Sequence, residues 1–177
     1  MWKRFTNAAR LVVFYAQEEA RRLNIKYVDS EHLLFGIISV GDDSMAAAVL
    51  LSLGLTLNSI RSALESRVNI QETIPFADYE LSEDAKLVIE MTRQEVMGLK
   101  HNYVSTAHLL LGLIRDMDGQ GGKILRGLGL ELESVRAAYV QQIQETGERE
   151  KIETPLLDRH GILAGFQKLW MKWRSKT

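Results

Sequence analysis

The chain has 177 residues, of which 46% are apolar and 25% are charged, and its net charge at pH 7 is -1. This length can bury one substantial core or two small cores in contact, and the balanced charge recruits neither nucleic acid nor an anionic surface. The absence of cysteine excludes disulfides, cysteine-ligated zinc and thiol chemistry, and it suits the reducing cytoplasm. We expect no signal segment at the amino terminus, and no apolar run approaches the roughly 20 residues that span a bilayer.

The first predicted element is a helix over residues 5–23, because apolar residues recur there at intervals of three and four. Thr6 is placed to cap its start, and Asn24 follows it at the point where a left-handed residue ends a helix. Three further helices are predicted in the first half of the chain, with landmarks at Ser30 for the start of the second, Gly54 for the end of the third and Thr56 before the fourth.

The first half of the chain is then repeated. Residues 27–38 read YVDSEHLLFGII and residues 103–114 read YVSTAHLLLGLI, an offset of 76 with seven of twelve positions identical. The apolar positions of residues 5–23 recur at the same offset, which falls to 75 after the matched block because one loop residue is missing. A duplication of this length indicates two copies of one packing solution, each with four helices.

The fold class follows from what surrounds these helices. No segment alternates with the two-residue period of a half-buried strand, and Pro75 and Pro155 lie between the copies and after the second copy. We therefore predict an all-α fold of two pseudo-symmetric four-helix repeats followed by an amphipathic carboxy-terminal helix. The predicted segments are the first repeat at 1–69, a linker at 70–80, the second repeat at 81–146, a linker at 147–160 and the tail helix at 161–177.

This pattern resembles a known family. Residues 5–6, residues 16–23 and the paired blocks of the form Ser/Thr-x-His-Leu-Leu-x-Gly are similar to the double amino-terminal repeat domain of the Clp ATPases, closest to the ClpC type. The resemblance covers about residues 1–144. It implies an all-helical module that docks substrates and adaptors for a chaperone, present here as a free-standing copy without the ATPase motor.

A search for nucleotide chemistry gives a negative result. Residues 119–123 read GQGGK, but Met117 stands where a phosphate loop has its first glycine, and Ile124 stands where it has the hydroxyl that binds Mg²⁺. We therefore interpret this segment as a flexible loop between helices. We predict no enzymatic activity, no cofactor and no metal.

The repeated histidines invite a catalytic or metal interpretation. His32 and His108 occupy the same position in the two copies, each with the same apolar surroundings, so we expect each ring to bond a neighbouring backbone group. A relay built from Asp29, Ser30 and His32 is excluded, because adjacent residues at a helix start point in divergent directions. The other two histidines receive no role.

The resemblance implies one ligand site. In ClpC-type domains a threonine after the first phenylalanine and a glutamate in the repeated block help to receive arginine-phosphorylated segments, and the matching residues are Thr6 and Glu31. The second copy has Ser82 and Ala107 at these positions, so it lacks the carboxylate and one site per chain is expected. A carboxylate pairs with a guanidinium, and helix starts accept phosphate. The alternative is that Glu31 only complements the positive end of its helix.

The tail departs from the family pattern. Residues 161–177 contain no acidic residue, and a helical wheel places apolar side chains on one side and basic side chains around the other. The residues predicted to dock are Phe166, Leu169, Trp170 and Trp173. We expect them to dock on their own domain or on a protein partner, and the alternative is contact with a membrane.

These observations together predict a non-catalytic protein-binding module, an accessory or adaptor in Clp-type chaperone and protease quality control. Its expected partners are substrate segments, adaptors or Clp subunits. The alternative is a scaffold anchored to a membrane face or a larger complex through the tail helix. Nucleic acid is not an expected partner, because basic residues of the body are interleaved with acids. The expected location is the cytoplasm, with the periphery of a membrane as the alternative.

Overall fold

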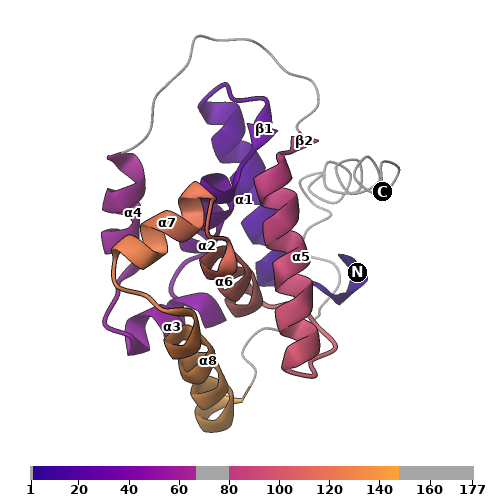
Figure 1. The fold of residues 1–177 in the computed structure, drawn as a ribbon, viewed down its shortest axis with the longest axis vertical. Coiled ribbons are helices and arrows are strands. Elements are labelled where there is room, and N and C mark those ends of the chain that lie inside the picture. Colours follow the sequence, from indigo (N-terminus) through magenta and orange to yellow (C-terminus); the bar gives the residue numbers. More distant parts are fainter. Residues whose placement is uncertain (1, 67–79, 148–177) are drawn as a thin grey trace.

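The structure is a computed structural model that describes residues 2–66 and 80–147. Eight α-helices make up most of these ranges (Figure 1). They are α1 (Asn7–Arg22), α2 (Ser30–Val40), α3 (Met45–Ser52), α4 (Leu57–Glu65), α5 (Glu83–Gly98), α6 (Thr106–Arg115), α7 (Gln120–Gly127) and α8 (Leu132–Thr146). The prediction of an all-α fold with four helices per copy is confirmed. The tail helix, with Phe166, Leu169, Trp170 and Trp173, and nearly all of the linker at 70–80 lie outside the described residues.

The helix ends follow the predicted local signals. Oγ1 of Thr6 accepts a hydrogen bond from the amide of Ala9 at 3.1 Å and so caps α1, and Ser82 caps α5 in the same way. Asn24 has a φ of 57° after the end of α1, the left-handed conformation that closes a helix. Gly54, predicted to end the third helix, and Gly129, its equivalent in the second copy, also have positive φ.

The two copies share one core. Helices α2 and α6 contact each other and lie in the middle of the molecule, with α1 packed on α2 and α5 packed on α6 (Figure 1). Helix α3 packs on α8 and α7 packs on α2, so each copy contacts the other through its third helix. Composition left open whether there is one core or two. The buried apolar side chains of both copies form a single cluster, which includes Phe5, Leu33, Leu34, Leu109, Leu110 and Tyr139.

Short parallel pairings join the copies at two places, one near each end of α1. β1 (Tyr27–Val28) pairs in parallel with β2 (Glu80–Leu81), and one isolated bridge joins Phe5 to Val104. The two contacts are equivalent. In each, the residue before a helix cap, Phe5 or Leu81, pairs with the second residue of the repeated block in the other copy, Val104 or Val28. The sequence predicted no strand, since segments of two residues are too short to produce a visible alternation.

A second pair of contacts also crosses between the copies. The Ser30 hydroxyl accepts a hydrogen bond from the amide of Gly121 at 3.1 Å, and the Thr106 hydroxyl accepts one from the amide of Ala46 at 2.9 Å. Both amides lie in the first turn of a helix, where backbone donors have no partner within the helix. Each copy therefore satisfies a helix start of the other, and neither four-helix unit is complete alone.

The glycine-rich segment is a helix start and not a flexible loop. Gly119 is the N-cap, and residues 120–123 form the first turn of α7. A Cβ added to Gly121 would lie 2.6 Å from the carbonyl oxygen of Ser30, and one added to Gly122 would lie 2.2 Å from another backbone oxygen. The loop prediction is therefore wrong, because these glycines serve a close approach of backbones rather than chain flexibility.

In the described ranges, no helix by itself combines the length and the apolar character needed to cross a bilayer. Helices α2 and α3 satisfy this criterion of length and composition only as a combined segment, and that segment is bent by 93°.

Candidate functional site

The structure does not bring Thr6 and Glu31 together. Thr6 caps the start of α1, whereas Glu31, in the first turn of α2, lines a cavity with Glu19 and Arg22 near the other end of α1. A helix with the 16 residues of α1 is about 24 Å long, so the two side chains lie about 20 Å apart. Thr6 is also fully buried, so its hydroxyl serves the fold and does not line a surface site.

The short parallel pairings bring helix starts of different copies together. The amide of Ser82 donates to the carbonyl of Val28 at 3.0 Å, and the amide of Thr6 donates to the carbonyl of Val104 at 2.9 Å. The start of α5 therefore lies beside the start of α2, and the start of α1 lies beside the start of α6. The expected grouping of Thr6 with Glu31 within the first copy is therefore not the arrangement of the fold. The matched residues pair across the copies, Glu31 with Ser82 and Thr6 with Ala107.

Glu31 is a half-buried carboxylate among other carboxylates. Burial raises the pKa of Glu31 above its ordinary value, and the charges of Asp29 and Asp84 raise it further. Within residues 2–66 and 80–147, no ion pair reaches Glu31. Glu83 adds another acid in the first turn of α5. We name these four residues the acidic edge, a place where a cation is favoured electrostatically.

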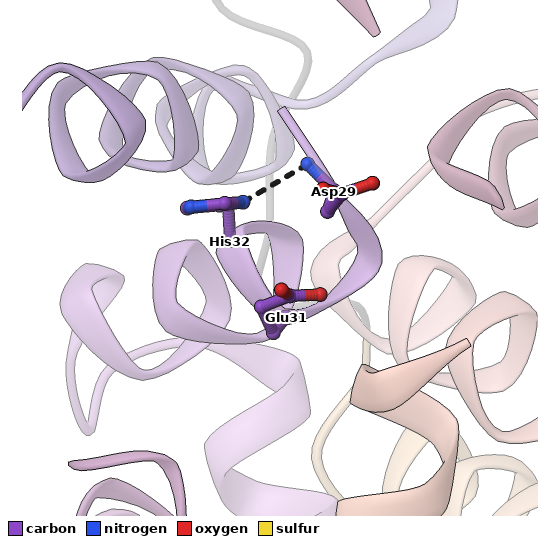
Figure 2. Close-up of side chains that lie close together, drawn as sticks. All are labelled: Asp29, Glu31 and His32. Carbon is purple, nitrogen blue, oxygen red and sulfur yellow. Dashed lines mark hydrogen bonds between the residues drawn. The ribbon is translucent and has the colours of Figure 1, made fainter. Parts of the chain in front are cut away.

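Asp29, Glu31 and His32 have the composition of a metal site, and their ligand atoms lie within 4.8 Å of one another. However, Nδ1 of His32 accepts a hydrogen bond from the amide of Asp29 at 2.9 Å, and Figure 2 shows the other ring nitrogen pointing away from both carboxylates. A cation would have to displace the amide from the Nδ1 lone pair. The cluster is better explained as the cap of α2, in which His32 takes the place of the glutamate of a capping box.

The prediction for the repeated histidines is confirmed. Nδ1 of His108 accepts a hydrogen bond from the amide of Ser105 at 3.0 Å, as His32 does from Asp29. Because Nδ1 is the acceptor, Nε2 carries the proton of each neutral ring. In the second copy Nε2 lies 2.9 Å from Nδ1 of His101. His101 therefore provides the hydrogen-bond acceptor for the second buried histidine. The sequence predicted no role for His101, because the equivalent residue of the first copy is Ile25 and the histidine is not repeated.

An ion-pair network built on one buried carboxylate joins α5 to α6 and α8 in the second copy. Glu95 is 5% exposed and accepts hydrogen bonds from Arg115 at 2.9 Å and from Arg136 at 3.0 Å. Hydrogen bonds from Arg136 to the carboxylates of Glu95 and Glu133 raise the pKa of this guanidinium, so the arginine stays charged. Glu95 thus connects α5 with both α6 and α8.

We expect Glu95→Ala to lower the free energy of unfolding by about 2 kcal/mol, because it removes charge-assisted hydrogen bonds to two arginines, of which Arg136 keeps Glu133 as a partner. Urea unfolding followed by circular dichroism measures this change. Glu90→Ala is the matched control on the same helix, since the pair of Glu90 with Arg93 is exposed and contributes less than about 1 kcal/mol. Equal losses in the two variants would contradict the assigned role of Glu95.

Comparisons with known proteins identify relatives of this fold. The family model of the Clp repeat (R) N-terminal domain matches residues 4–151. An "ATP-dependent Clp protease ATP-binding subunit ClpA homolog" of Guillardia theta is 36% identical over 167 residues, which cover 91% of this chain and 20% of the relative. The chloroplastic chaperone protein ClpC2 of Oryza sativa subsp. japonica is 36% identical over 148 residues, which cover 84% of this chain and 16% of the relative. The chain therefore spans a fifth or less of the length of these relatives.

Two solved structures share the fold. The N-terminal domain of the caseinolytic protease associated chaperone ClpD from Arabidopsis thaliana has a TM-score of 0.62 at 24% identity, covering 81% of this chain and 97% of that domain. The Hsp104 N-terminal domain from Candida albicans has a TM-score of 0.67 at 16% identity, covering 84% and 97%. At these identities the likeness concerns the fold alone. The family match, by contrast, includes every helix described above, and the chain belongs to the Clp repeat (R) N-terminal domain family.

Proposed function

We propose that this chain is a protein-binding module of Clp-type chaperone and protease systems and that it has no catalytic activity of its own. The family match supports this proposal, as do relatives whose names describe a chaperone and a protease subunit. The proposed partners are substrate segments, adaptors or Clp subunits. The observation that carries the proposal is the acidic edge, which the two copies build jointly from α2 and α5.

The acidic edge suits a guanidinium group better than a phosphate. Glu31 offers a half-buried carboxylate near Asp84, and a carboxylate binds the planar guanidinium through two parallel hydrogen bonds. The starts of α2 and α5 favour an anion, but Glu83 and Asp84 occupy the first turn of α5 and oppose one. We therefore propose an arginine-bearing segment as the ligand, with phosphorylated arginine as a second form held by the same guanidinium contact.

We expect one arginine site per chain. Titration of isotopically labelled protein with N-acetyl-arginine amide should shift backbone resonances at the starts of α2 and α5. Glu31→Gln should weaken this binding about tenfold, because a hydrogen bond to a charged group contributes about 1.5 to 3 kcal/mol. Glu145→Gln, on the exposed surface of α8, is the matched control and should leave the binding unchanged. Binding that survives Glu31→Gln would refute the site.

The phosphorylated form tests the electrostatics of the same edge. Free phosphoarginine is expected to bind the wild-type chain more weakly than N-acetyl-arginine amide, and Asp84→Asn should reduce this difference. Thr6→Ser should have no effect, because Thr6 lies at the far end of α1. Two equivalent phosphoarginine sites would contradict the proposal, since Ala107 offers no second carboxylate.

The alternative, a scaffold anchored through the tail helix, depends on the four residues predicted to dock, Phe166, Leu169, Trp170 and Trp173. These residues lie outside the described ranges, so no contact in the structure favours it.

A further inference from the structure

His32 contains a buried hydrogen-bond donor that has no partner among the described residues. The residue is 2% exposed, and Nε2 makes no hydrogen bond. Nδ1 accepts from the amide of Asp29, so Nε2 carries the proton of the neutral ring. Burial lowers the pKa of His32, which favours this neutral form. A buried N–H without an acceptor is costly and calls for one.

His32 lines a cavity of about 560 Å³ between the end of α1, the start of α2 and helices α4 and α7. Ile25, Leu64 and Ile124 form apolar parts of the wall. Arg61 lies over the Phe35 ring, 5.8 Å from its centroid, and both residues line the same cavity. This volume is within the range of sites that hold small ligands.

The second copy shows what fills the equivalent place. There His101 replaces Ile25, and Tyr139 replaces Leu64. The Nε2–H of His108 meets Nδ1 of His101 at 2.9 Å, and the His101 and Tyr139 rings meet edge to face at 5.9 Å. The occupant is therefore a neutral imidazole whose unprotonated nitrogen accepts from the buried donor. The first copy keeps the donor but has neither of the two rings.

We propose that the His32 cavity binds a neutral heteroaromatic ring whose unprotonated nitrogen accepts the hydrogen bond of Nε2–H. The apolar wall covers the ring faces. Glu19 is already neutralised by Arg22 at 2.7 Å, so this carboxylate does not require a cationic ligand. Such a ring is found in the unprotonated histidine side chain of a peptide and in free small heterocycles, which share the same acceptor chemistry. Glu31 belongs both to the acidic edge and to the lining of this cavity, whereas Ser82, Glu83 and Asp84 do not line it. The two proposed sites are therefore neighbours, and Asp84 is the residue that distinguishes them.

The probe for this site is 4-methylimidazole, which reproduces the side chain of His101. It is titrated against the labelled full chain at a pH where the probe is neutral. We expect saturable binding with a Kd in the millimolar range for so small a ligand, with a shift of the His32 Nε2 resonance. The control probe 3-methylpyrrole has the same ring size and an N–H but no acceptor nitrogen, and it should bind about tenfold more weakly. Equal binding of the two probes, or no binding of 4-methylimidazole, would overturn the proposal.

Three variants test whether the probe binds in this cavity. Ile25→His builds the occupant of the second copy into the first, so it should abolish probe binding and raise the urea midpoint of unfolding. Ile25→Val leaves the cavity open and should retain binding. His32→Asn keeps an acceptor for the amide of Asp29 but removes the donor at the position of Nε2, because the amide N–H groups of the shorter side chain lie closer to the backbone. The variant should fold and lose the preference for 4-methylimidazole over 3-methylpyrrole. A preference that persists in His32→Asn would refute the role of Nε2.

Two further experiments distinguish the cavity site from the arginine site and a peptide histidine from a free heterocycle. Asp84→Asn alters the acidic edge and should leave 4-methylimidazole binding unchanged, so failure of the arginine site and failure of the cavity site give different results. A short acetylated peptide with one central histidine is titrated in parallel. Binding of the peptide through the His32 resonance identifies a histidine side chain as the source, and binding of the free probe alone identifies a small heterocycle.

Discussion

Gly112→Ala is expected to lower the free energy of unfolding by about 3 kcal/mol, the upper part of the range for overpacking a core. An added Cβ would lie 2.1 Å from Oγ1 of Thr92 and 2.7 Å from the carbonyl oxygen of Val88. The second of these atoms belongs to the backbone of α5, so α5 and α6 would have to move apart. Gly36 has the equivalent place in the first copy, where a Cβ would lie 2.1 Å from the carbonyl oxygen of Val12 on α1.

The measurement is urea unfolding followed by circular dichroism, with Gly98→Ala as the matched control. Gly98 ends α5, and nothing lies within 4 Å of an added Cβ there. Because alanine has the higher helix propensity, this control should raise stability by up to about 1 kcal/mol. Gly36→Ala should resemble Gly112→Ala. If Gly112→Ala matched the Gly98 control instead, the close approach of α5 and α6 would be refuted.

Local features of the fold could be predicted because each depends on neighbours in the chain. The cap at Thr6 and the left-handed residue Asn24 act within one turn of α1, and the apolar stripe of a helix requires only its period. The backbone bond of His32 also spans only three residues. These were the predictions that the structure confirmed, together with the number of helices per copy.

The relation between the copies could not be predicted in the same way. A duplication shows which residues are equivalent, but it does not show whether the two units stand side by side or interlock. Ser30 bonds the start of α7 across 91 positions of the chain, and this contact leaves no local pattern. For the same reason the sequence groups Thr6 with Glu31, although the fold brings the start of α2, which carries Glu31, beside Ser82.

The glycines also show that close packing between helices leaves no signal in the sequence. A pair such as Gly121 and Gly122 resembles a flexible loop in sequence. Only the packing of α7 against the start of α2 and the end of α6 shows why a Cβ is excluded at each position. Similarly, the difference between Ile25 and His101 has no meaning until His32 and His108 are seen to point toward these positions. The tail face of Phe166, Leu169, Trp170 and Trp173 stays a prediction, because it lies outside the described residues.

Acidification is expected to destabilise the protein through its buried histidines, and most of all through His108. Burial, with a smaller contribution from the charge of His101, lowers the pKa of His108 from 6.5 to about 3. Nδ1 already accepts from the amide of Ser105, and Nε2–H already meets His101, so a second ring proton would face a backbone donor. The folded protein therefore resists a proton that the unfolded chain binds readily.

The sign of the pH dependence follows from this difference. The unfolded chain binds the proton first as the pH falls below 6.5, so the contribution of His108 is fully present above pH 6.5 and declines down to about pH 3. His32 and His101 also have lowered pKa values and act in the same direction. Between pH 6.5 and pH 5 the ordinary carboxylates remain ionised. The raised pKa of Glu31 acts in the opposite direction to the histidines, so the slope in this interval is the contribution of the histidines less that of Glu31.

The expected result is a free energy of unfolding that falls by up to about 1.4 kcal/mol per pH unit for each such histidine across this interval. Urea unfolding at a series of pH values measures the slope. His108→Asn keeps an acceptor for the amide of Ser105 and should reduce the slope, although it lowers stability at neutral pH by removing the contact with His101. Lys100→Gln, an exposed change beside His101, should leave the slope unaltered. A slope that His108→Asn does not reduce, or a stability that rises on acidification, would show that the buried ring of His108 does not control the response.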